Sequence, residues 1–384
     1  MQKGIIIVTR NDEVRHMIYL DHAATTKPDG RVIEAVARCM AENWANPSSP
    51  CAMAGDARRE LRLARQAVAG MLNAGAGEIV FTSGGSEANS QAMTLARGGH
   101  AVVSAIEHHS VLNAARRWAE EATPVQPDAN GVVRPEAVAA AIREDTRLIS
   151  VQLVNNETGV IQPVAAIGAI ARARRIPFHC DAVQAFGQIP IDVRAMNIDL
   201  LSLSAHKLYG PRGAGALWVR QGIDIGPLID GGGQEFGLRS GTENVPGVCG
   251  LRVAAALARE DMDARAARER ALIDGFIREL RKTIPGAAPL CLRAERAPGI
   301  VAVLLPGMDS ERMIAALDLR DIAVSGGAAC ASAAREPSHV YRALGLSERD
   351  ARCVIRVSVG RHTTREEMAA AAGAIERIYE ANGK

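Results

Sequence analysis

The sequence predicts an α/β fold, with a mostly parallel sheet in a large domain and a smaller α+β domain after it. Between residues 57 and 220, strands that are apolar along their whole length alternate with helical patterns. This alternation is typical of a parallel sheet covered by helices on both faces. Beyond residue 222 the chain becomes glycine-rich and irregular, and residues 251–282 then form one long, charged amphipathic pattern. That pattern predicts a helix bridging the two domains.

The individual elements follow from the spacing of the apolar residues. Helices of the large domain are expected where these residues recur at helical spacing, at 57–72, 87–96, 111–121, 135–143 and 165–174. Its strands are expected at the short apolar runs 78–82, 101–104, 148–154, 177–180, 200–203 and 214–219. The smaller domain is expected to contain strands at 300–305 and 354–358, helices at 310–319 and 364–381, and a loop at 325–334.

The chain is expected to divide into four parts. Residues 1–16 are predicted to be a tail outside the fold, because Met17 opens a segment typical of a natural start. Residues 17–30 are predicted to join the small domain, residues 31–255 to form the large domain, and residues 256–384 to form the small domain with the Cys330 loop. The N-terminal apolar piece is too short for a secretory signal, and no apolar run reaches transmembrane length.

Composition argues against several classes of protein. The 384 residues carry a net charge of +2 with both signs interspersed, whereas one sign would dominate in a protein that binds nucleic acid or a membrane surface. The seven cysteines are scattered and form no C-x-x-C pair. This disfavours zinc-ribbon and thioredoxin sites and suits the reduced thiols of the cytoplasm. We therefore expect a cytoplasmic protein without a metal site.

Lys207 is the most informative residue of the chain. It follows the predicted strand 200–203 in the stretch Ser204-Ala205-His206-Lys207. A lysine just past a buried strand can lose water, which disfavours the charged amine and frees its lone pair for Schiff-base chemistry. The stretch also fits the S-x-x-K signature of a serine acyl-enzyme, but the S-D-N and K-T-G motifs that accompany that signature are absent.

Four further motifs follow predicted strands. The glycine turn before Ser86 opens a helix whose N-terminus suits a phosphate, with an ordinary serine-capped turn as the alternative. Asp181 could pair with a cationic pyridine nitrogen or cap the next helix. His108 could stack on a planar ligand or shuttle a proton, and Asn156 could bind a ligand, although such residues are commonly structural. All would converge at the carboxyl edge of one parallel sheet.

The C-terminal region adds a thiol and an arginine. Cys330 lies among small residues in Ser325–Ala333, where an exposed thiol could act as a nucleophile and a linker with an unused cysteine is the alternative. Arg356 lies within an apolar strand. Its charge would have to be satisfied there by a bound carboxylate or by an internal Asp or Glu.

Ordered motifs cover the chain from residue 17 to about 380. They are M-I-Y-L-D-H-A-A-T-T, N-P-S-S, F-T-S-G-G-S-E-A-N, I-E-H-H-S-V, N-N-E-T-G, D-A-V-Q, S-A-H-K-L-Y-G-P, G-G-G-Q-E, R-S-G-T-E-N, C-A-S-A, E-P-S-H-V and I-R-V-S-V-G-R. In this order they resemble the motifs of cysteine desulfurases of the NifS/IscS type. The resemblance implies a fold-type I enzyme of the class V aminotransferase group that depends on pyridoxal 5'-phosphate (PLP).

The resemblance implies a role for each matching residue. Lys207 would hold PLP through a Schiff base and move the substrate Cα proton, while His108 would stack on the ring and take part in proton transfer. Asp181 would pair with the pyridine nitrogen and Gln184 with the ring hydroxyl. Thr242 would reach the phosphate in the partner subunit, which implies a homodimer. The remaining phosphate ligands would be Gly85, Ser86, Ser204 and His206.

The same resemblance implies the reaction. Asn156 would face cofactor and substrate, and Arg356 would grip the carboxylate of L-cysteine. Cys330 would attack the substrate sulfur, so that L-alanine leaves and a persulfide passes to an acceptor protein for iron–sulfur cluster assembly or thio-modification. Cys330 could also be a transient iron–sulfur ligand. The alternatives are a selenocysteine lyase, another class V enzyme of a specialised sulfur pathway, and a non-catalytic persulfide carrier.

Two positions depart from the pattern of that family. Cys51 stands where the family usually has histidine, and Phe236 stands where it usually has arginine. These departures leave the acceptor and the exact substrate open. We expect Cys51 to be a replaced pocket residue rather than a second sulfur carrier.

Overall fold

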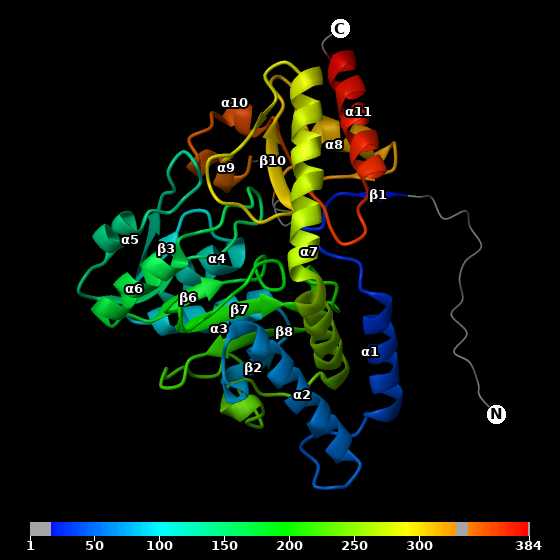
Figure 1. Ribbon diagram of the computed structural model, residues 1–384. Coiled ribbons are helices and arrows are strands. Elements are labelled where there is room, and N and C mark those ends of the chain that lie inside the picture. The colour runs from blue at the N-terminus through cyan, green and yellow to red at the C-terminus, as the bar shows by residue number, and fades with distance from the viewer. Residues whose placement is uncertain (1–16, 328–336, 383–384) are drawn as a thin grey trace, which may run out of the picture.

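The computed structural model describes residues 17–327 and 337–382. Figure 1 shows a large α/β body and a smaller body above it, with the long helix α7 (Val245–Thr283) running along both. The predicted tail, residues 1–16, lies outside the described residues. The predicted boundary between residues 255 and 256 falls inside α7, and the division into domains stays a prediction.

A seven-stranded sheet forms the centre of the large body, in the order β2-β8-β7-β6-β5-β3-β4. Only β8 among these strands runs antiparallel to its neighbours. The carboxyl ends of the other six therefore share one edge, which is where open α/β sheets bind ligands. The strands are β2 (Ile79–Thr82), β3 (His100–Ser104), β4 (Glu121–Val125), β5 (Thr146–Ser150), β6 (Phe178–Asp181), β7 (Leu200–Ser204) and β8 (Gly215–Val219).

Helices cover both faces of this sheet. Val102 and Val103 of β3 belong to two different apolar clusters, as expected for successive strand residues that point to opposite faces. One cluster includes α2 and α6, and the other includes α3 and α4. The helices of this body are α1 (Gly30–Glu42), α2 (Ala54–Leu72), α3 (Gly85–Met93), α4 (His109–Trp118), α5 (Pro135–Ala141) and α6 (Val164–Arg174).

The smaller body has its own apolar core. Leu20, Phe276 and Ile355 belong to this core, so the N-terminal segment, α7 and a C-terminal strand meet there. Strand β10 (Ile300–Leu304) pairs antiparallel with β12 (Val354–Ser358) and β9 (Ala288–Pro289), while β1 (Ile18–Tyr19) pairs parallel with β11 (Ile322–Ala323). The helices are α8 (Ser310–Asp318), α9 (His339–Ala343), α10 (Glu348–Ala351) and α11 (Arg365–Asn382).

The predicted α/β fold class is confirmed, and three element predictions were inaccurate. Residues 119–121 do not continue a helix, because α4 ends at Trp118 and β4 begins at Glu121. Strand β4 lies at the sheet edge and contains Pro124, which an edge strand tolerates. Strand β5 ends at Ser150 rather than at residue 154. Helix α7 begins at Val245, six residues before the predicted start, and Asn244 caps it by accepting from the Gly247 amide.

His179 makes the stability of the sheet depend on pH. Its ring is fully buried on β6 between Ser150 Oγ (2.8 Å) and Ser202 Oγ (2.9 Å). Burial lowers the pKa of His179 to about 3, whereas an unfolded histidine titrates near 6.5. Below pH 6.5, His179 therefore binds a proton in the unfolded chain but not in the folded chain. The free energy of unfolding falls as the pH falls from 6.5 toward 3.

The expected loss from His179 is about 2 kcal/mol of unfolding free energy between pH 7.5 and pH 5. Denaturant unfolding at both pH values measures it. In His179→Gln the difference between the two pH values should shrink by that amount, while the exposed His362→Gln variant serves as the control. An unchanged difference in His179→Gln would show that His179 does not carry this dependence.

Candidate active site

A cavity of about 200 Å³ lies at the carboxyl edge of the large sheet. Of the predicted site residues that the structure describes, all except Thr242 lie in its wall. The predicted residues that line it are Gly85, Ser86, His108, Asn156, Asp181, Gln184, Ser204, His206, Lys207 and Arg356. The expectation that polar residues after separate strands converge on one crevice is therefore confirmed.

Lys207 projects from a single helical turn, η3 (Ala205–Lys207), directly after β7. Its Nζ donates to the backbone carbonyls of Ala23 (2.5 Å) and Ala24 (2.8 Å). Ala23 and Ala24 belong to the N-terminal motif M-I-Y-L-D-H-A-A-T-T. The backbone of this motif therefore positions the Lys207 amine and forms part of the site. Burial lowers the pKa of the neighbouring His206 to about 4, so that its ring is neutral at pH 7.

Asp181 is the last residue of β6, and both of its carboxylate oxygens have partners. Oδ1 accepts from the Val183 amide (2.9 Å), and Oδ2 accepts from Asn89 Nδ2 (2.7 Å). The residues after Asp181 form turns rather than a helix, so it is not a helix cap. Sequence reasoning gave no role to Asn89, although it ends the F-T-S-G-G-S-E-A-N motif.

His108 caps the N-terminus of α4, where its Nδ1 accepts from the Ser110 amide (3.1 Å). Burial lowers the pKa of His108, although the nearby Asp181 opposes this shift. The ring is therefore neutral at pH 7. Because Nδ1 accepts, the ring proton resides on Nε2.

Glu107 is a buried carboxyl group behind the cavity wall, and the sequence analysis did not single it out. Its Oε1 accepts from the Gln152 amide (2.7 Å), and Gln152 lines the cavity. Burial, assisted by the charge of Asp181, raises the pKa of Glu107 well above its usual range. Burial therefore favours the neutral form of the Glu107 carboxyl group.

The start of α3 offers an anion site beside Lys207. The helix begins at Gly85 immediately after β2, so its first amide groups lack partners within the helix. A Cβ on Gly85 would lie 2.5 Å from Val183 Cγ2, so only glycine lets the turn approach the Asp181 strand end this closely. The Ser204 hydroxyl and the His206 ring line the same cavity.

This donor set fits PLP. The cavity combines an amine for the aldehyde, a carboxylate for the pyridine nitrogen, and amide and hydroxyl groups for the phosphate. These groups come from Lys207, Asp181 and the α3 turn, on three different strand ends.

Arg356 is 1% exposed and contacts Asp21 at 2.5 Å. Its Nη1 donates to the Asn156 carbonyl (2.9 Å), while Nε has no hydrogen-bond partner among the described residues. The internal carboxylate considered as the alternative for Arg356 is therefore present. The guanidinium still lines the cavity with one unsatisfied donor, and a bound carboxylate would supply a partner for it.

Two predicted site residues are not among those that line this cavity in the described part of the chain. Cys330 belongs to residues 328–336, outside the described residues. The residues that flank that segment are described. The Ser325 amide donates to the Arg356 carbonyl (3.1 Å) on one side. On the other side, Ser338 Oγ donates to Glu157 Oε2 (2.6 Å). Thr242 is exposed and does not line the cavity of its own chain.

The two departures from the family pattern also lie outside the cavity. Cys51 is exposed beside Ser49, so the expectation of a pocket residue is not met within one chain. The Phe236 ring packs on the Arg65 guanidinium, which also forms an ion pair with Glu235. Phe236 thereby helps to hold the loop before Thr242.

Comparison with known proteins identifies the family of the chain. The model of the family described as aminotransferase class-V matches residues 18–370. A cysteine desulfurase IscS from Anaeromyxobacter sp. (strain K) is 43% identical over 363 residues, which cover 91% of this chain and 89% of the relative. The chain belongs to the cysteine desulfurases of the class V aminotransferase family. The cofactor of this family is PLP, as predicted.

Solved structures of the desulfurase family share the fold. A NifS-like protein from Rickettsia africae ESF-5 has a TM-score of 0.88 at 33% identity, and the match covers 95% of this chain and all of that one. A structure of SspA in complex with cysteine has a TM-score of 0.79 at 35% identity, covering 90% of this chain and 99% of that one. Among the helices described for this chain, none has the length and apolarity to cross a bilayer.

Proposed function

We propose that this desulfurase converts L-cysteine to L-alanine and places the sulfur on Cys330 as a persulfide. One observation carries the proposal: an amine, a buried carboxylate and a buried guanidinium, from Lys207, Asp181 and Arg356, line one cavity. When bound, PLP supplies an electron sink for negative charge that develops at the substrate Cα. The residues of the chain hold, orient and protonate the groups around that centre.

Within this proposal, Asp181 faces the pyridine nitrogen and Gln184 the ring hydroxyl. Asn89 and Val183 fix the Asp181 carboxylate, so it is oriented before the cofactor binds. Gln184 is held by a bond from its Nε2 to the Ala23 carbonyl (2.7 Å). The phosphate is assigned to Gly85, Ser86, Ser204 and His206.

Arg356 and Asn156 are assigned to L-cysteine. A substrate carboxylate would meet the guanidinium at its unsatisfied Nε and share its charge with Asp21. This places the substrate Cα beside Lys207, whose amine takes the Cα proton. His108, a neutral ring with a proton on Nε2, assists this proton transfer.

Cys330 is assigned to the sulfur step. Its thiolate attacks the substrate sulfur, and an S–S bond forms as the Cβ–S bond breaks. The carbon product gains a proton at Cβ, and the proton taken by the Lys207 amine returns to Cα to give L-alanine. Gly327 is described and lies against Glu157, whose chain neighbour Asn156 lines the cavity. Cys330 follows Gly327 by three residues in the sequence, and three residues of chain can span at most about 11 Å.

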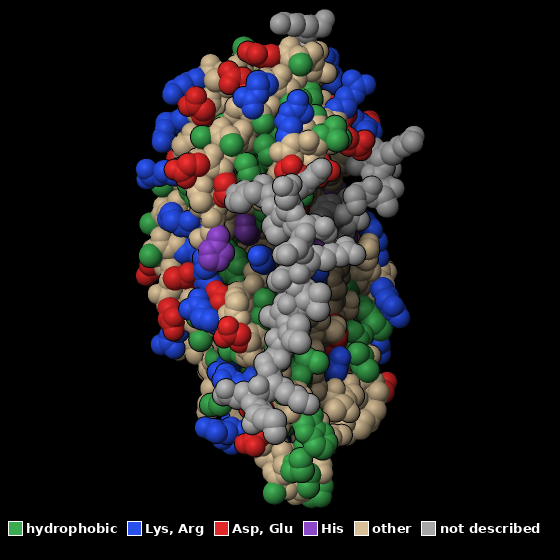
Figure 2. All heavy atoms as spheres, turned by 90° about the vertical axis from the view of Figure 1, so that its right-hand side faces the viewer, with side chains coloured by type: hydrophobic (Ala, Val, Ile, Leu, Met, Phe, Trp, Pro, Cys, Tyr) green, Lys and Arg blue, Asp and Glu red, His purple; other side chains and the backbone are tan. Residues whose placement is uncertain are grey.

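The chain is further proposed to act as a cytoplasmic homodimer that passes sulfur to an acceptor for iron–sulfur cluster assembly or thio-modification. Met40, Trp44 and Met53 are each more than half exposed. Figure 2 shows hydrophobic side chains gathered at the lower end of the molecule in that view. Such a surface suits burial between subunits. The exposed Thr242 is then available to the cofactor phosphate in the partner subunit. Sedimentation at the monomer mass would contradict the dimer.

The decisive assay incubates the PLP-loaded enzyme with L-cysteine and quantifies L-alanine and protein-bound persulfide. We expect equal amounts of both in the first turnover, with the persulfide mapped to Cys330. L-selenocysteine in parallel separates the two candidate substrates. A chain that releases selenium but forms no L-alanine from L-cysteine is a selenocysteine lyase, and one that forms neither product is not this enzyme.

A further inference from the structure

A second, smaller cavity shares Lys207 with the one described above. The centre of a water molecule can occupy about 20 Å³ of this cavity. That volume is enough for one buried water. Lys207, Gln184 and Ala23 line both cavities and therefore form the wall between them. The other titratable or amide side chains in its wall are those of His22, Gln188, Tyr209 and Glu269.

Glu269 of α7 brings a buried carboxyl group to this cavity. Its side chain is 2% exposed, and Oε1 has no hydrogen-bond partner among the described residues. A buried acceptor without a donor is costly. Gly299 permits the close approach, because a Cβ there would lie 2.9 Å from Glu269 Oε2. Oε1 lies 3.7 Å from Arg265 Nη1, an ion pair too long to be a hydrogen bond. A small donor within the cavity, such as water, would supply the missing hydrogen bond.

His22 supplies a second acceptor in the same wall. Its Nδ1 is buried and has no hydrogen-bond partner among the described residues. Burial lowers the pKa of His22 to about 4, so the ring is neutral at pH 7. A water in this cavity can therefore donate to His22 or Glu269 and accept from the Lys207 ammonium, which satisfies the two to four polar partners that buried waters have.

We propose that this cavity holds one water and that Glu269 exchanges a proton with the Lys207 amine through it. The proposal rests on Lys207 being the base of the proposed reaction. A protonated Lys207 gives one proton to the water as an N–H bond breaks. The water passes one of its protons to Glu269, where an O–H bond forms. The water is unchanged, and the free lone pair of Lys207 is restored.

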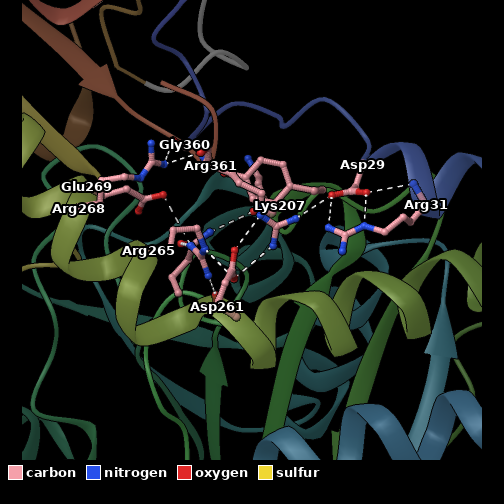
Figure 3. A network of polar contacts seen from close by, with 12 residues as sticks. Asp29, Arg31, Lys207, Asp261, Arg265, Arg268, Glu269, Gly360 and Arg361 are labelled. Atoms are coloured by element: carbon pink, nitrogen blue, oxygen red, sulfur yellow. Dashed lines mark hydrogen bonds and ion pairs between the residues drawn. The ribbon is translucent and has the colours of Figure 1, made fainter. Parts of the chain in front are cut away.

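The surroundings of Glu269 suit this exchange. Figure 3 shows Glu269, Arg265 and Asp261 extending from α7 toward the Lys207 region. Burial raises the pKa of Glu269 to about 7, with Arg265 and Arg268 opposing and Asp261 adding to the shift. A carboxyl group that titrates near neutral pH can both accept and return a proton at working pH.

The remaining groups facing Glu269 are held in place by their own contacts. Burial raises the pKa of Tyr209 to about 12, and the Arg361 guanidinium stacks on its ring at 4.7 Å. Gln188 accepts from Arg265 and donates to the Lys207 carbonyl (3.3 Å), which connects α7 to the lysine backbone. Glu269 is thus the acidic group in this wall that can change its protonation near pH 7.

Infrared difference spectroscopy of the PLP-loaded enzyme tests the site without turnover. We expect a carboxylic-acid carbonyl band that titrates near pH 7, and its loss in Glu269→Gln. Glu279→Gln is the matched control, because Glu279 lies on the same helix with an exposed side chain paired to Lys282. A crystal structure should show the water in contact with Glu269. Absence of both the water and the titrating band would overturn the proposal.

Exchange of the L-alanine Cα proton in heavy water tests the role. In Glu269→Gln we expect the exchange rate to fall roughly 10-fold and the limb of its pH profile near neutrality to disappear, with PLP content unchanged. An exchange rate and pH profile equal to those of wild type would refute the relay while leaving the desulfurase function intact. A wild-type chain that makes no L-alanine from L-cysteine would instead refute the proposed function, and the infrared result would still stand.

Discussion

Replacing Lys207 by alanine is expected to lower the rate of L-alanine formation from L-cysteine at least about 10³-fold. The substitution removes both the covalent attachment of the cofactor and the base that accepts the Cα proton. The other cationic side chain described in the cavity wall, that of Arg356, is paired with Asp21, so it cannot replace this amine as the base. Product quantification by amino-acid analysis measures the effect.

The attachment itself gives an independent readout. Reduction with borohydride followed by mass spectrometry should find the cofactor bound to Lys207 in the wild type and no covalent cofactor in Lys207→Ala. Lys282→Ala is the control, because Lys282 lies on the surface of α7 with a 70% exposed side chain. Full activity in Lys207→Ala, or cofactor trapped on another lysine, would refute the assignment.

Replacing Cys330 by alanine is expected to abolish persulfide formation and to reduce L-alanine release at least about 10²-fold, while the earlier proton step survives. The substitution changes none of the described residues that line the cavity, so it removes only the proposed acceptor of the substrate sulfur. Exchange of the L-alanine Cα proton in heavy water should therefore continue at close to the wild-type rate.

Cys51→Ala is the matched control for the thiol. Cys51 is exposed, and Ser49 lowers its pKa through a hydrogen bond, so it is reactive enough for a fair comparison. We expect Cys51→Ala to keep both activity and persulfide. Persulfide mapped to Cys51, or full L-alanine release by Cys330→Ala, would contradict the role given to Cys330.

Much of the fold was predictable from local pattern. Strands buried on both faces are apolar throughout, and this signal located β3, β6 and β7 to within a few residues. Edge strand β4 was not predicted. It is largely exposed, so it lacks the continuous apolar run of a buried strand, and its polar residues follow directly on those of the preceding helix. The start of α7 was missed because glycine and proline in its first turn weaken the helical pattern.

Much of the candidate site was predictable as well, for a topological reason. Residues that follow parallel strands must share one edge of the sheet, so Lys207, Asp181 and His108 could be grouped before their contacts were known. Their partners could not be predicted. Asp21 reaches Arg356 across 335 residues of sequence, and Ala23 and Ala24 hold Lys207 through backbone atoms that any residue type would offer.

The sequence by itself determined the order of the strands and helices, the family motifs and the identity of the chemical groups at the strand ends. Only the tertiary structure decided that Arg356 is already paired, that Glu107 is buried beside Asp181, and that Glu269 shares a cavity with Lys207. Residue type and spacing reveal which groups a strand presents. Burial, and the charge and hydrogen-bonding partners that set protonation, depend on segments brought together only when the chain folds.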